Sequence, residues 1–478
     1  MRNKINTVIC AGLAALGLAA CGGGGDAEER STAQASGADA NALAEHAQDE
    51  SAAEASRAQI RATAGTPAIG TLALVSSNVA GRARGGSPCA VSATGMLVAF
   101  NSTASDVVAA DTNAANDVFL KNLRTGAVTR VSTNSAGAQL IGGALCLAMT
   151  PDGNSVVLQT AGGSNPYLPP IEPAIFVKNV ATGALTRVTP PLNTFPTTAA
   201  YLFQSISDDG LRVALIATPT TAYLGGYETA ALGPARALVR DLGTGSLTNL
   251  SADVQLDLNQ GAYEGSLLLS PDGRKLAFST RINYPALGDN NGKSDVFVLD
   301  VATRNVALAS SNSGGVQVTI SGPPLFNPTL RVIGFLAGGA QLAYEVPGDS
   351  SLGAAGAYIK NLNNATSKLV YASGNSSLPV LSFSDDGNLA AFDRAIYPPN
   401  AQQIDAVWVR DLRTGAERRV NTTAGGVVGN NQARLARVSR DGSSVVFQSN
   451  ASNLLTAVRG TYETYIKTIS TAASPLPQ

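Results

Sequence analysis

The sequence predicts an all-β protein, a seven-bladed β-propeller of four-stranded antiparallel blades. An Asp-Gly type turn recurs along the body of the chain, and an alternating strand with a shared ending follows each copy. The composition agrees, because 49 Gly and 23 Pro with only 14% charged residues suit a chain of many turns and few helices. Repeats of this kind indicate units that bury their apolar faces by stacking on one another.

The first residues predict a signal peptide over residues 1–20. A basic start, Met1 to Lys4, precedes an apolar run from Ile5 to Ala20 that is too short to span a bilayer. The run ends in Leu18-Ala19-Ala20-Cys21, which resembles the bacterial lipobox. That resemblance implies lipidation of Cys21, and the following Gly22 implies sorting to the outer membrane of a Gram-negative cell.

Residues 21–68 predict a disordered tether. Ala, Ser, Gly, Asp, Glu and Gln dominate this segment, and Leu43 and Ile60 are almost its only large apolar side chains, so it cannot bury a core. The body, residues 69–478, is then expected in the cell envelope, facing the periplasm or the cell surface, attached to the membrane through Cys21. A formal net charge of −1 without a basic run argues against a nucleic-acid partner.

Each unit of the body begins with a strand that ends in a tight turn. The fullest copy is Ser270-Pro271-Asp272-Gly273, and a degenerate copy, Leu336 to Gly339, lacks the Ser and the Asp. Glycine accepts positive φ and Asp bonds its own backbone, so the motif forms a hairpin. The marker glycines are Gly95, Gly153, Gly210, Gly273, Gly339, Gly387 and Gly442.

A second signature follows each turn, an alternating strand that ends in Lys or Arg and then Asn or Asp. Val118 to Asn122 and Val407 to Asp411 are examples, and a Thr-Gly turn such as Thr125-Gly126 then leads to a further strand. Two hairpins give four antiparallel strands per blade. We interpret the repeated basic-polar pair as a salt-bridge and hydrogen-bond ladder on outer strands.

The repeat resembles the TolB-type WD-like propeller repeats of bacterial envelope proteins, most closely in Ser-Pro-Asp-Gly-Arg-Lys-Leu-Ala-Phe at residues 270–278. The resemblance covers residues 71–470 and implies the propeller fold. The TolB protein carries an α/β domain ahead of its propeller, where this chain has the predicted tether. The resemblance therefore implies the fold and not a role in the Tol–Pal system.

The last unit predicts how the ring closes. After the strand Tyr465 to Ile469 the chain has no Thr-Gly turn and no fourth strand, whereas Thr71 to Ser76 precede the first unit and match Ala127 to Ser132 in form. Because an open blade exposes an unpaired strand edge, we predict that residues 71–76 pair with residues 464–469.

The body has no histidine, because His46 in the tether is the only one in the chain. A Ser-His-Asp or Cys-His catalytic arrangement therefore has no base there. We predict a protein that is not an enzyme, with no catalytic or cofactor-binding residues. The alternative is a carboxylate-dependent carbohydrate-active enzyme, although the recurring acids are interpreted as turn formers: Asp152, Asp209, Asp272, Asp386 and Asp441.

Two loops place oxygen-bearing side chains at alternating positions and are candidate Ca²⁺ sites, since Ca²⁺ takes six to eight oxygen ligands. The candidate ligands are Asp111, Asn113 and Asp117 in the first loop and Asp289, Asn291 and Asp295 in the second. Hairpins closed by Asx-turns fit the same pattern, and neither loop has the bidentate Glu that ends an EF-hand calcium loop. A calcium-stabilised structural module is thus a further alternative.

Cys89 and Cys146 are the thiols left after processing, and they lie six and seven residues before Gly95 and Gly153. They therefore occupy opposite faces of their strands. Neighbouring blades also meet through opposite faces, so the two sulfurs either face one another or point apart. A disulfide, which suits an exported protein, and two buried free thiols both fit the sequence.

The combined prediction is a non-enzymatic, lipid-anchored, monomeric propeller that binds an envelope protein or polysaccharide through loops on one face. Aromatic residues in Pro- or Gly-rich inserts are the candidates for partner contact: Phe195, Tyr201, Tyr223, Tyr227, Phe326 and Tyr397.

Overall fold

The computed structural model describes residues 70–469 except 161–173, 191–198, 220–234, 255–266, 320–328, 349, 374–378, 397–402 and 456–460. The predicted signal peptide, Cys21 and the predicted tether lie outside the described residues.

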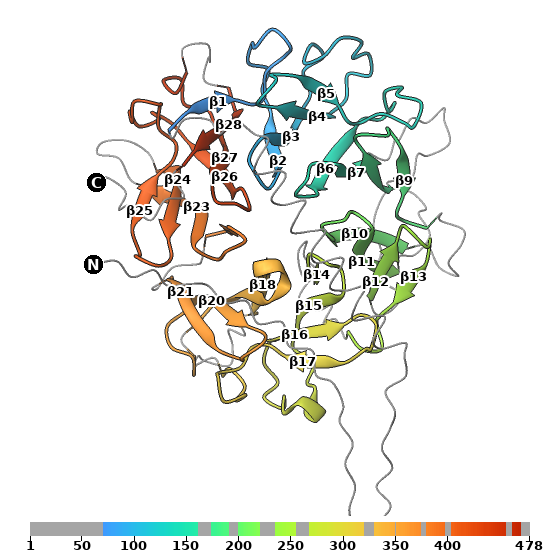
Figure 1. Ribbon diagram of the computed structural model, residues 1–478, viewed down its shortest axis with the longest axis vertical. Coiled ribbons are helices and arrows are strands. Elements are labelled where there is room, and N and C mark those ends of the chain that lie inside the picture. The colour runs from blue at the N-terminus through green and yellow to red at the C-terminus, as the bar shows by residue number, and fades with distance from the viewer. Residues whose placement is uncertain are drawn as a thin grey trace, which may run out of the picture. The chain divides into compact units, whose positions relative to one another are not determined.

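The described chain forms seven four-stranded antiparallel sheets, arranged as blades around a central axis (Figure 1). The predicted seven-bladed β-propeller is confirmed. Blades 1 to 3 contain β2 (Ser87–Val91), β3 (Leu97–Ser102), β4 (Asp117–Asn122) and β5 (Val128–Arg130); β6 (Ala144–Met149), β7 (Ser155–Thr160), β8 (Ile175–Asn179) and β9 (Leu185–Arg187); and β10 (Ala199–Ile206), β11 (Arg212–Pro219), β12 (Arg236–Asp241) and β13 (Leu247–Asn249).

Blades 4 to 6 have the same strand order, with the first strand nearest the axis (Figure 1). They contain β14 (Leu267–Leu269), β15 (Lys275–Thr280), β16 (Asp295–Asp300) and β17 (Val306–Leu308); β18 (Arg331–Leu336), β19 (Gln341–Val346), β20 (Gly356–Asn361) and β21 (Ser367–Ala372); and β22 (Leu381–Phe383), β23 (Leu389–Ile396), β24 (Ile404–Asp411) and β25 (Glu417–Arg419).

Blade 7 closes the ring with strands from both ends of the body. It contains β26 (Ala433–Val438), β27 (Ser444–Ser449), β28 (Glu463–Thr468) and, as its outermost strand, β1 (Leu72–Leu74). Leu72 pairs with Lys467 and Leu74 with Tyr465. The predicted closure is confirmed, with a regular strand shorter than the predicted residues 71–76.

The turns between first and second strands form by the predicted mechanism. In blade 4 the Asp272 carboxylate accepts the Ser270 hydroxyl at 2.5 Å and the Arg274 N–H at 3.0 Å. Gly273 has φ +67°, and a Cβ there would lie 2.9 Å from Cδ of Arg212 in blade 3. Glycine thus provides both the backbone angle and the room for close packing between blades.

The core lies between and within the blades. Second and third strands place ring pairs opposite one another in four blades, and buried aromatic pairs of this kind add to the stability of a sheet. These stacked pairs are Phe100–Phe119, Phe278–Phe297, Tyr344–Tyr358 and Phe447–Tyr465, with centroids 5.5 to 6.2 Å apart.

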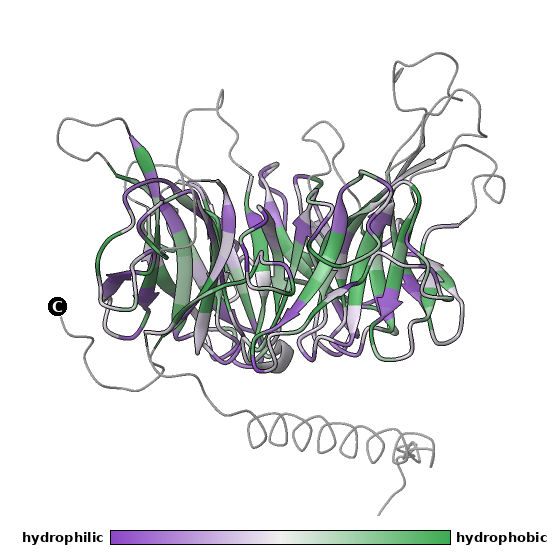
Figure 2. Ribbon diagram, turned by 90° about the horizontal axis from the view of Figure 1, so that it is seen from above, coloured by the Kyte–Doolittle hydropathy of each residue, from purple (hydrophilic) through white to green (hydrophobic). Residues whose placement is uncertain are grey.

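The strands run between two faces of the ring, seen from the side in Figure 2. We call the face with the Asp-Gly type and Thr-Gly type turns the turn face, and the opposite face, which carries the other connections, the loop face. The described helices are the 3-10 segments η3 (Pro285–Leu287) and η4 (Ala337–Gly339). In the described residues no helix has the length and apolar character needed to cross a membrane.

Backbone hydrogen bonds join the innermost turns into a ring on the turn face. The bonds are Ala93 N–H to Pro151 O, Asp208 N–H to Pro271 O, Ala337 N–H to Asp385 O, Asp385 N–H to Arg440 O and Asp441 N–H to Ala93 O, at 2.6 to 3.0 Å. The series is interrupted where the donor would be Pro151 or Pro271, which have no N–H. Arg440 of blade 7 also makes a bidentate ion pair with Asp208 of blade 3. Blades 3 and 7 are three steps apart in the ring, so this pair spans the axis.

Candidate functional site

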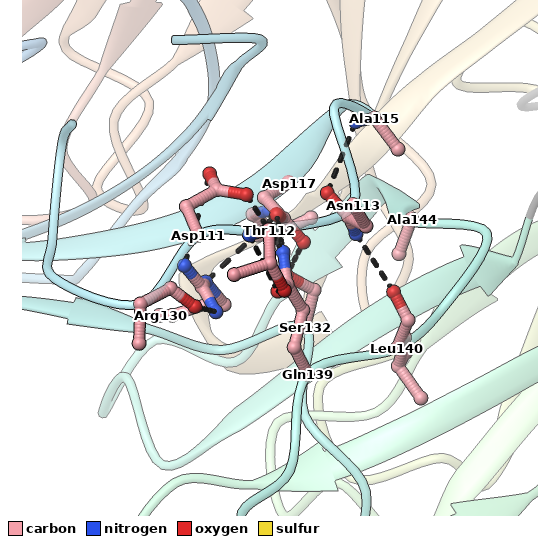
Figure 3. Close-up of polar contacts among 12 residues, drawn as sticks. Asp111, Thr112, Asn113, Ala115, Asp117, Arg130, Ser132, Gln139, Leu140 and Ala144 are labelled. Carbon is pink, nitrogen blue, oxygen red and sulfur yellow. Dashed lines mark hydrogen bonds and ion pairs between the residues drawn. The ribbon is translucent and has the colours of Figure 1, made fainter. Parts of the chain in front are cut away.

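The two predicted calcium loops lie at equivalent places in blades 1 and 4, on the loop face between the second and third strands. The first connects β3 to β4 and the second connects β15 to β16. In blade 1 the Gln139 amide donates to Asp111 Oδ1 and to Asp117 Oδ2, each at 2.8 Å (Figure 3). Asp117 is fully buried and also accepts the Ser132 hydroxyl. One amide therefore joins both carboxylates.

Arg130, the last residue of β5, supplies a positive charge to the blade 1 cluster (Figure 3). Its guanidinium lies 3.7 Å from Asp111 Oδ2 and 3.8 Å from Asp117 Oδ2, and it donates to the Ala110 carbonyl. The Asn113 side chain accepts the Ala115 N–H at 3.0 Å and donates to the Leu140 carbonyl, which makes an Asx-turn.

The blade 4 cluster repeats this arrangement without the arginine. Gln317 Nε2 donates to Asp289 Oδ1 and Asp295 Oδ2, each at 2.7 Å, and Ser310 donates to Asp295 Oδ1 at 2.5 Å. Leu308 stands where blade 1 has Arg130, since both residues pair with the central Phe of the third strand. Asp289 and Asp295 are both fully buried.

Burial raises the pKa of Asp295 to about 7. Hydrogen bonds from Ser310 and Gln317 lower this pKa, and the neighbouring Asp289 carboxylate raises it. A carboxyl group of this kind takes up a proton near neutral pH.

The structure brings the two acids of each loop together, whereas Asn113 and Asn291 close Asx-turns. The carboxylate lone pairs face amide and hydroxyl donors, with which a cation would compete. Within the described ranges, no group of three or more His, Cys, Asp or Glu is placed to hold a metal ion. Gln139 and Gln317 were missed at the sequence level, although both end a shared pattern, Ser132 to Gln139 and Ser310 to Gln317.

The recurring turn acids are all engaged by their own turns. In each case one carboxylate oxygen accepts the Ser or Thr hydroxyl two residues earlier, at 2.5 to 2.7 Å, and the backbone N–H two residues later, at 2.9 to 3.0 Å. The five residues are Asp152, Asp209, Asp272, Asp386 and Asp441.

The predicted salt-bridge ladder is wrong for the lysines of the basic-polar pairs. Lys178 in β8 donates to the carbonyls of Thr133 and Asn134 in the preceding blade, both at 3.0 Å. Related contacts with the preceding blade are made by Lys121, Lys360 and Lys467, and all four lysines are buried. The partners are backbone carbonyls and hydroxyls rather than carboxylates, so these lysines join neighbouring blades.

Cys89 in β2 and Cys146 in β6 form a disulfide, with their Cα atoms 5.9 Å apart. The sequence fits either a disulfide or two buried free thiols, and the structure contains the disulfide. It joins the innermost strands of blades 1 and 2 at matching bulges, where the register shifts between Pro88 and Ala90 and between Cys146 and Ala148.

Of the aromatic residues expected to contact a partner, Tyr201 lies in β10 and packs against the core between blades 2 and 3. The others lie outside the described residues: Phe195, Tyr223, Tyr227, Phe326 and Tyr397.

The innermost strands expose apolar and cationic side chains. Leu145 in β6 and Leu435 in β26 are 50% and 41% exposed. Within their described bounds, the seven innermost strands contain three charged residues, and all are arginines: Arg331, Arg434 and Arg437. All three are exposed. Water therefore reaches the axis, and no carboxylate stands on these strands.

No protein-family model matches the chain, and no curated protein matches it. Similar solved structures include an oligogalacturonate lyase in complex with manganese, 14% identical over 84% of this chain and 91% of that chain, with a TM-score of 0.47. An oligogalacturonate lyase from Vibrio parahaemolyticus is 12% identical over 84% of this chain and 92% of that one, with a TM-score of 0.48. A putative TolB from Agrobacterium tumefaciens is 11% identical over 81% and 90%, with a TM-score of 0.31. These likenesses concern the fold alone.

Proposed function

We propose that this protein is a non-enzymatic, lipid-anchored propeller of the bacterial cell envelope that binds another envelope component. The observation that supports it best is the chemistry of the axis. A carbohydrate-active enzyme of the carboxylate type needs two carboxyl groups on either side of a bound sugar. The described innermost strands offer three arginines and exposed leucines, and no acid. An acid that reaches the axis from a turn, Asp208, is paired with Arg440.

The remaining acids of the repeat support the same proposal. The five turn carboxylates each accept a hydroxyl and an N–H of their own turn, and the body has no histidine. The enzyme alternative would therefore require acids other than these five.

Attachment through Cys21 and residence in the envelope are part of the proposal. The lipobox-like end of the apolar run supports lipidation, and the Cys89–Cys146 disulfide suits an oxidising compartment. The proposed partner is an envelope protein or polysaccharide, bound by a monomer. Labelled palmitate should be incorporated by the wild type and not by Cys21→Ser, and label in that variant would contradict the anchor.

The binding proposal is tested with the full lipidated protein as bait in detergent-solubilised envelopes, alongside turnover assays on a polysaccharide panel. We expect a specific partner and no turnover. Cleavage of a polysaccharide that a single Asp or Glu substitution abolishes would overturn the proposal and favour the enzyme alternative.

A further inference from the structure

We propose that the axial opening, defined by Arg434, Leu435 and Arg437 of β26, binds an acidic peptide segment with aliphatic side chains, supplied by an envelope partner. This inference rests on the proposed binding function and names the ligand chemistry of its site. It is carried by the charge of the axis, by an exposed leucine in an unfavourable backbone conformation, and by closure of the axis at the turn face.

The charge at the axis differs in sign from that of the whole chain. The chain has a formal net charge of −1, whereas the charged residues of the described innermost strands are Arg331, Arg434 and Arg437. Arg331 is neutralised by Glu345, with Nη2 and Oε2 2.8 Å apart. The ion pairs found among the described residues include neither Arg434 nor Arg437. Two guanidinium groups are therefore available to an anion.

Arg434 is held in place without being neutralised. Its Nε donates to Gln448 Oε1 at 3.1 Å, and its guanidinium lies 4.6 Å from the centre of the Tyr462 ring. These contacts fix one side of the planar group and leave donors for the bidentate carboxylate pairing that arginine favours.

Arg437 is exposed, and within the described ranges its side chain makes no hydrogen bond or ion pair. Desolvation by the neighbouring protein lowers its pKa. Arg437 therefore presents its guanidinium to solvent from the innermost strand of blade 7. Asp393 of β23 attracts Arg437, but its two oxygens already accept the Leu435 N–H at 2.6 Å and the Ala436 N–H at 3.0 Å.

Leu435 indicates an apolar contact beside these cations. Its φ is +60°, a left-handed conformation that L-residues other than Gly, Asn and Asp rarely adopt, and the Asp393 carboxylate holds it there. The side chain is nevertheless 41% exposed. Backbone strain that presents an apolar side chain to solvent has no benefit for the core and is a feature of binding sites.

Further exposed aliphatic side chains lie in or shortly before the innermost strands of other blades. Leu145, the second residue of β6, is 50% exposed, Ile141 precedes β6 and is 80% exposed, and Val380 directly precedes β22 and is 68% exposed. All three stand at the loop-face ends of innermost strands. Aliphatic groups beside guanidinium groups match a peptide that alternates carboxylates with aliphatic residues. Exposed aliphatic side chains offer a polysaccharide no hydrogen bonds, so their presence beside the arginines favours a peptide.

The ligand must enter from the loop face. At the turn face the innermost turns are joined by backbone hydrogen bonds at 2.6 to 3.0 Å, and the Arg440–Asp208 pair spans the axis. The contacts at the turn face therefore restrict entry there, and the exposed aliphatic groups lie toward the loop face.

The test is fluorescence anisotropy with the full-length mature protein and a fluorescein-labelled peptide of alternating Leu and Glu. We expect saturable binding that is lost when Gln replaces each Glu. Arg437→Gln should weaken binding at least about tenfold, as loss of a charge-assisted bond predicts. The matched control, Arg413→Gln, removes an exposed arginine in the turn between β24 and β25 and should leave binding unchanged.

Leu435→Asn separates binding from folding. Asn tolerates the left-handed conformation, so the melting temperature should not fall, whereas peptide affinity should. Unchanged affinity in Arg437→Gln, or tighter binding of alginate than of the peptide, would overturn the inference. If the peptide does not bind while the pull-down still recovers a partner, this inference fails and the proposed function stands. If both fail, both are wrong.

Discussion

At the level of single residues, Arg130 and Leu308 show how one substitution changes the electrostatics of two otherwise similar clusters. In blade 1 the guanidinium of Arg130 lies within 3.8 Å of both carboxylates. In blade 4 the aliphatic Leu308 leaves burial as the dominant influence on Asp295, and burial favours the neutral acid.

Asp295→Asn should therefore reduce the pH dependence of stability. Because the folded-state pKa of about 7 lies above the ordinary value, the proton on Asp295 stabilises the fold fully below about pH 4, and this contribution is lost as the pH rises through about 7. At pH 8 the wild type has a buried charge on Asp295 and the variant has none. The variant should therefore be more stable than the wild type by about 1–3 kcal/mol at this pH. Urea unfolding at pH 5 and pH 8 measures the difference.

Leu308→Arg is the matched comparison, because it reproduces the blade 1 arrangement and should also flatten the profile. Parallel stability curves for wild type, Asp295→Asn and Leu308→Arg between pH 5 and 8 would show that Asp295 does not titrate in this range.

Calcium should have little effect on stability, because amide and hydroxyl donors occupy the carboxylate oxygens of Asp111, Asp117 and Asp295. A ligand that binds the folded state raises the melting temperature in proportion to its binding free energy. Calorimetry in millimolar Ca²⁺ and in EDTA should give melting temperatures within about 1 °C of each other. A rise of several degrees in Ca²⁺ would favour the calcium-stabilised module.

At the level of elements, the lysines of the third strands follow a rule that links neighbouring blades. Four segments after the outermost strands form short hairpins, which we call rim hairpins, with bridges Ser77–Ala83, Thr133–Gln139, Ser311–Gln317 and Thr422–Val428. Each receives the lysine of the next blade, which is Lys121, Lys178, Lys360 and Lys467 in that order. The equivalent positions of the other blades hold Arg240, Leu299 and Arg410.

Lys178→Met should destabilise the protein, since it removes the buried ammonium group that donates to the carbonyls of Thr133, Asn134 and Gly183. Loss of buried hydrogen bonds to a charged group costs about 2–4 kcal/mol. Lys368→Met, at an exposed position of β21, should change the free energy of unfolding by less than about 0.5 kcal/mol. Equal effects in urea titrations would show that the inter-blade contact contributes nothing.

The features that repeat within one unit were predictable from the sequence, and those that join units were only partly so. The Ser270 to Gly273 turn is local, so residue types alone predict its hydrogen bonds. Lys178 meets carbonyls that lie more than forty positions earlier in the chain, and Gln139 reaches Asp111 from the rim hairpin that follows β5. Such partners depend on how strands and blades pack together, which no local pattern contains.

The exposed arginines of β26 illustrate the same limit at the candidate site. Arg434 and Arg437 occur in a short strand whose alternation is broken by a bulge between Arg434 and Arg437. Period-two alternation assigns faces wrongly across a bulge. Only the folded ring shows that both side chains lie on the same side of the sheet and are exposed.

At the level of the whole molecule, the ring depends on a three-residue strand. β1 pairs with β28, and backbone bonds from Gly70 to Thr468 and from Val75 to Thr464, at 2.9 and 2.8 Å, extend the contact at both ends. Ser76 adds a hydrogen bond to the buried Glu463 carboxylate at 2.5 Å.

Deleting residues 69–78 should therefore lower the melting temperature by at least about 10 °C, because it exposes the edge of β28 and the apolar residues that β1 covers. Deleting residues 22–66 should leave the melting temperature almost unchanged. Differential scanning calorimetry compares the two, and equal tolerance of both deletions would refute a closing role for β1.

The placement of β1 also has a consequence for how the protein is made. β1 leaves the ribosome before every other strand of the ring, whereas its partner β28 is the last strand of the ring to be made. Blades 1 to 6 are each contiguous in the chain and are able to form one after another as the chain emerges, but β1 must wait as an unpaired strand until β28 has emerged. Chains that are truncated before β28 leave β1 unpaired. The exposed strand makes such chains targets for chaperones and proteases.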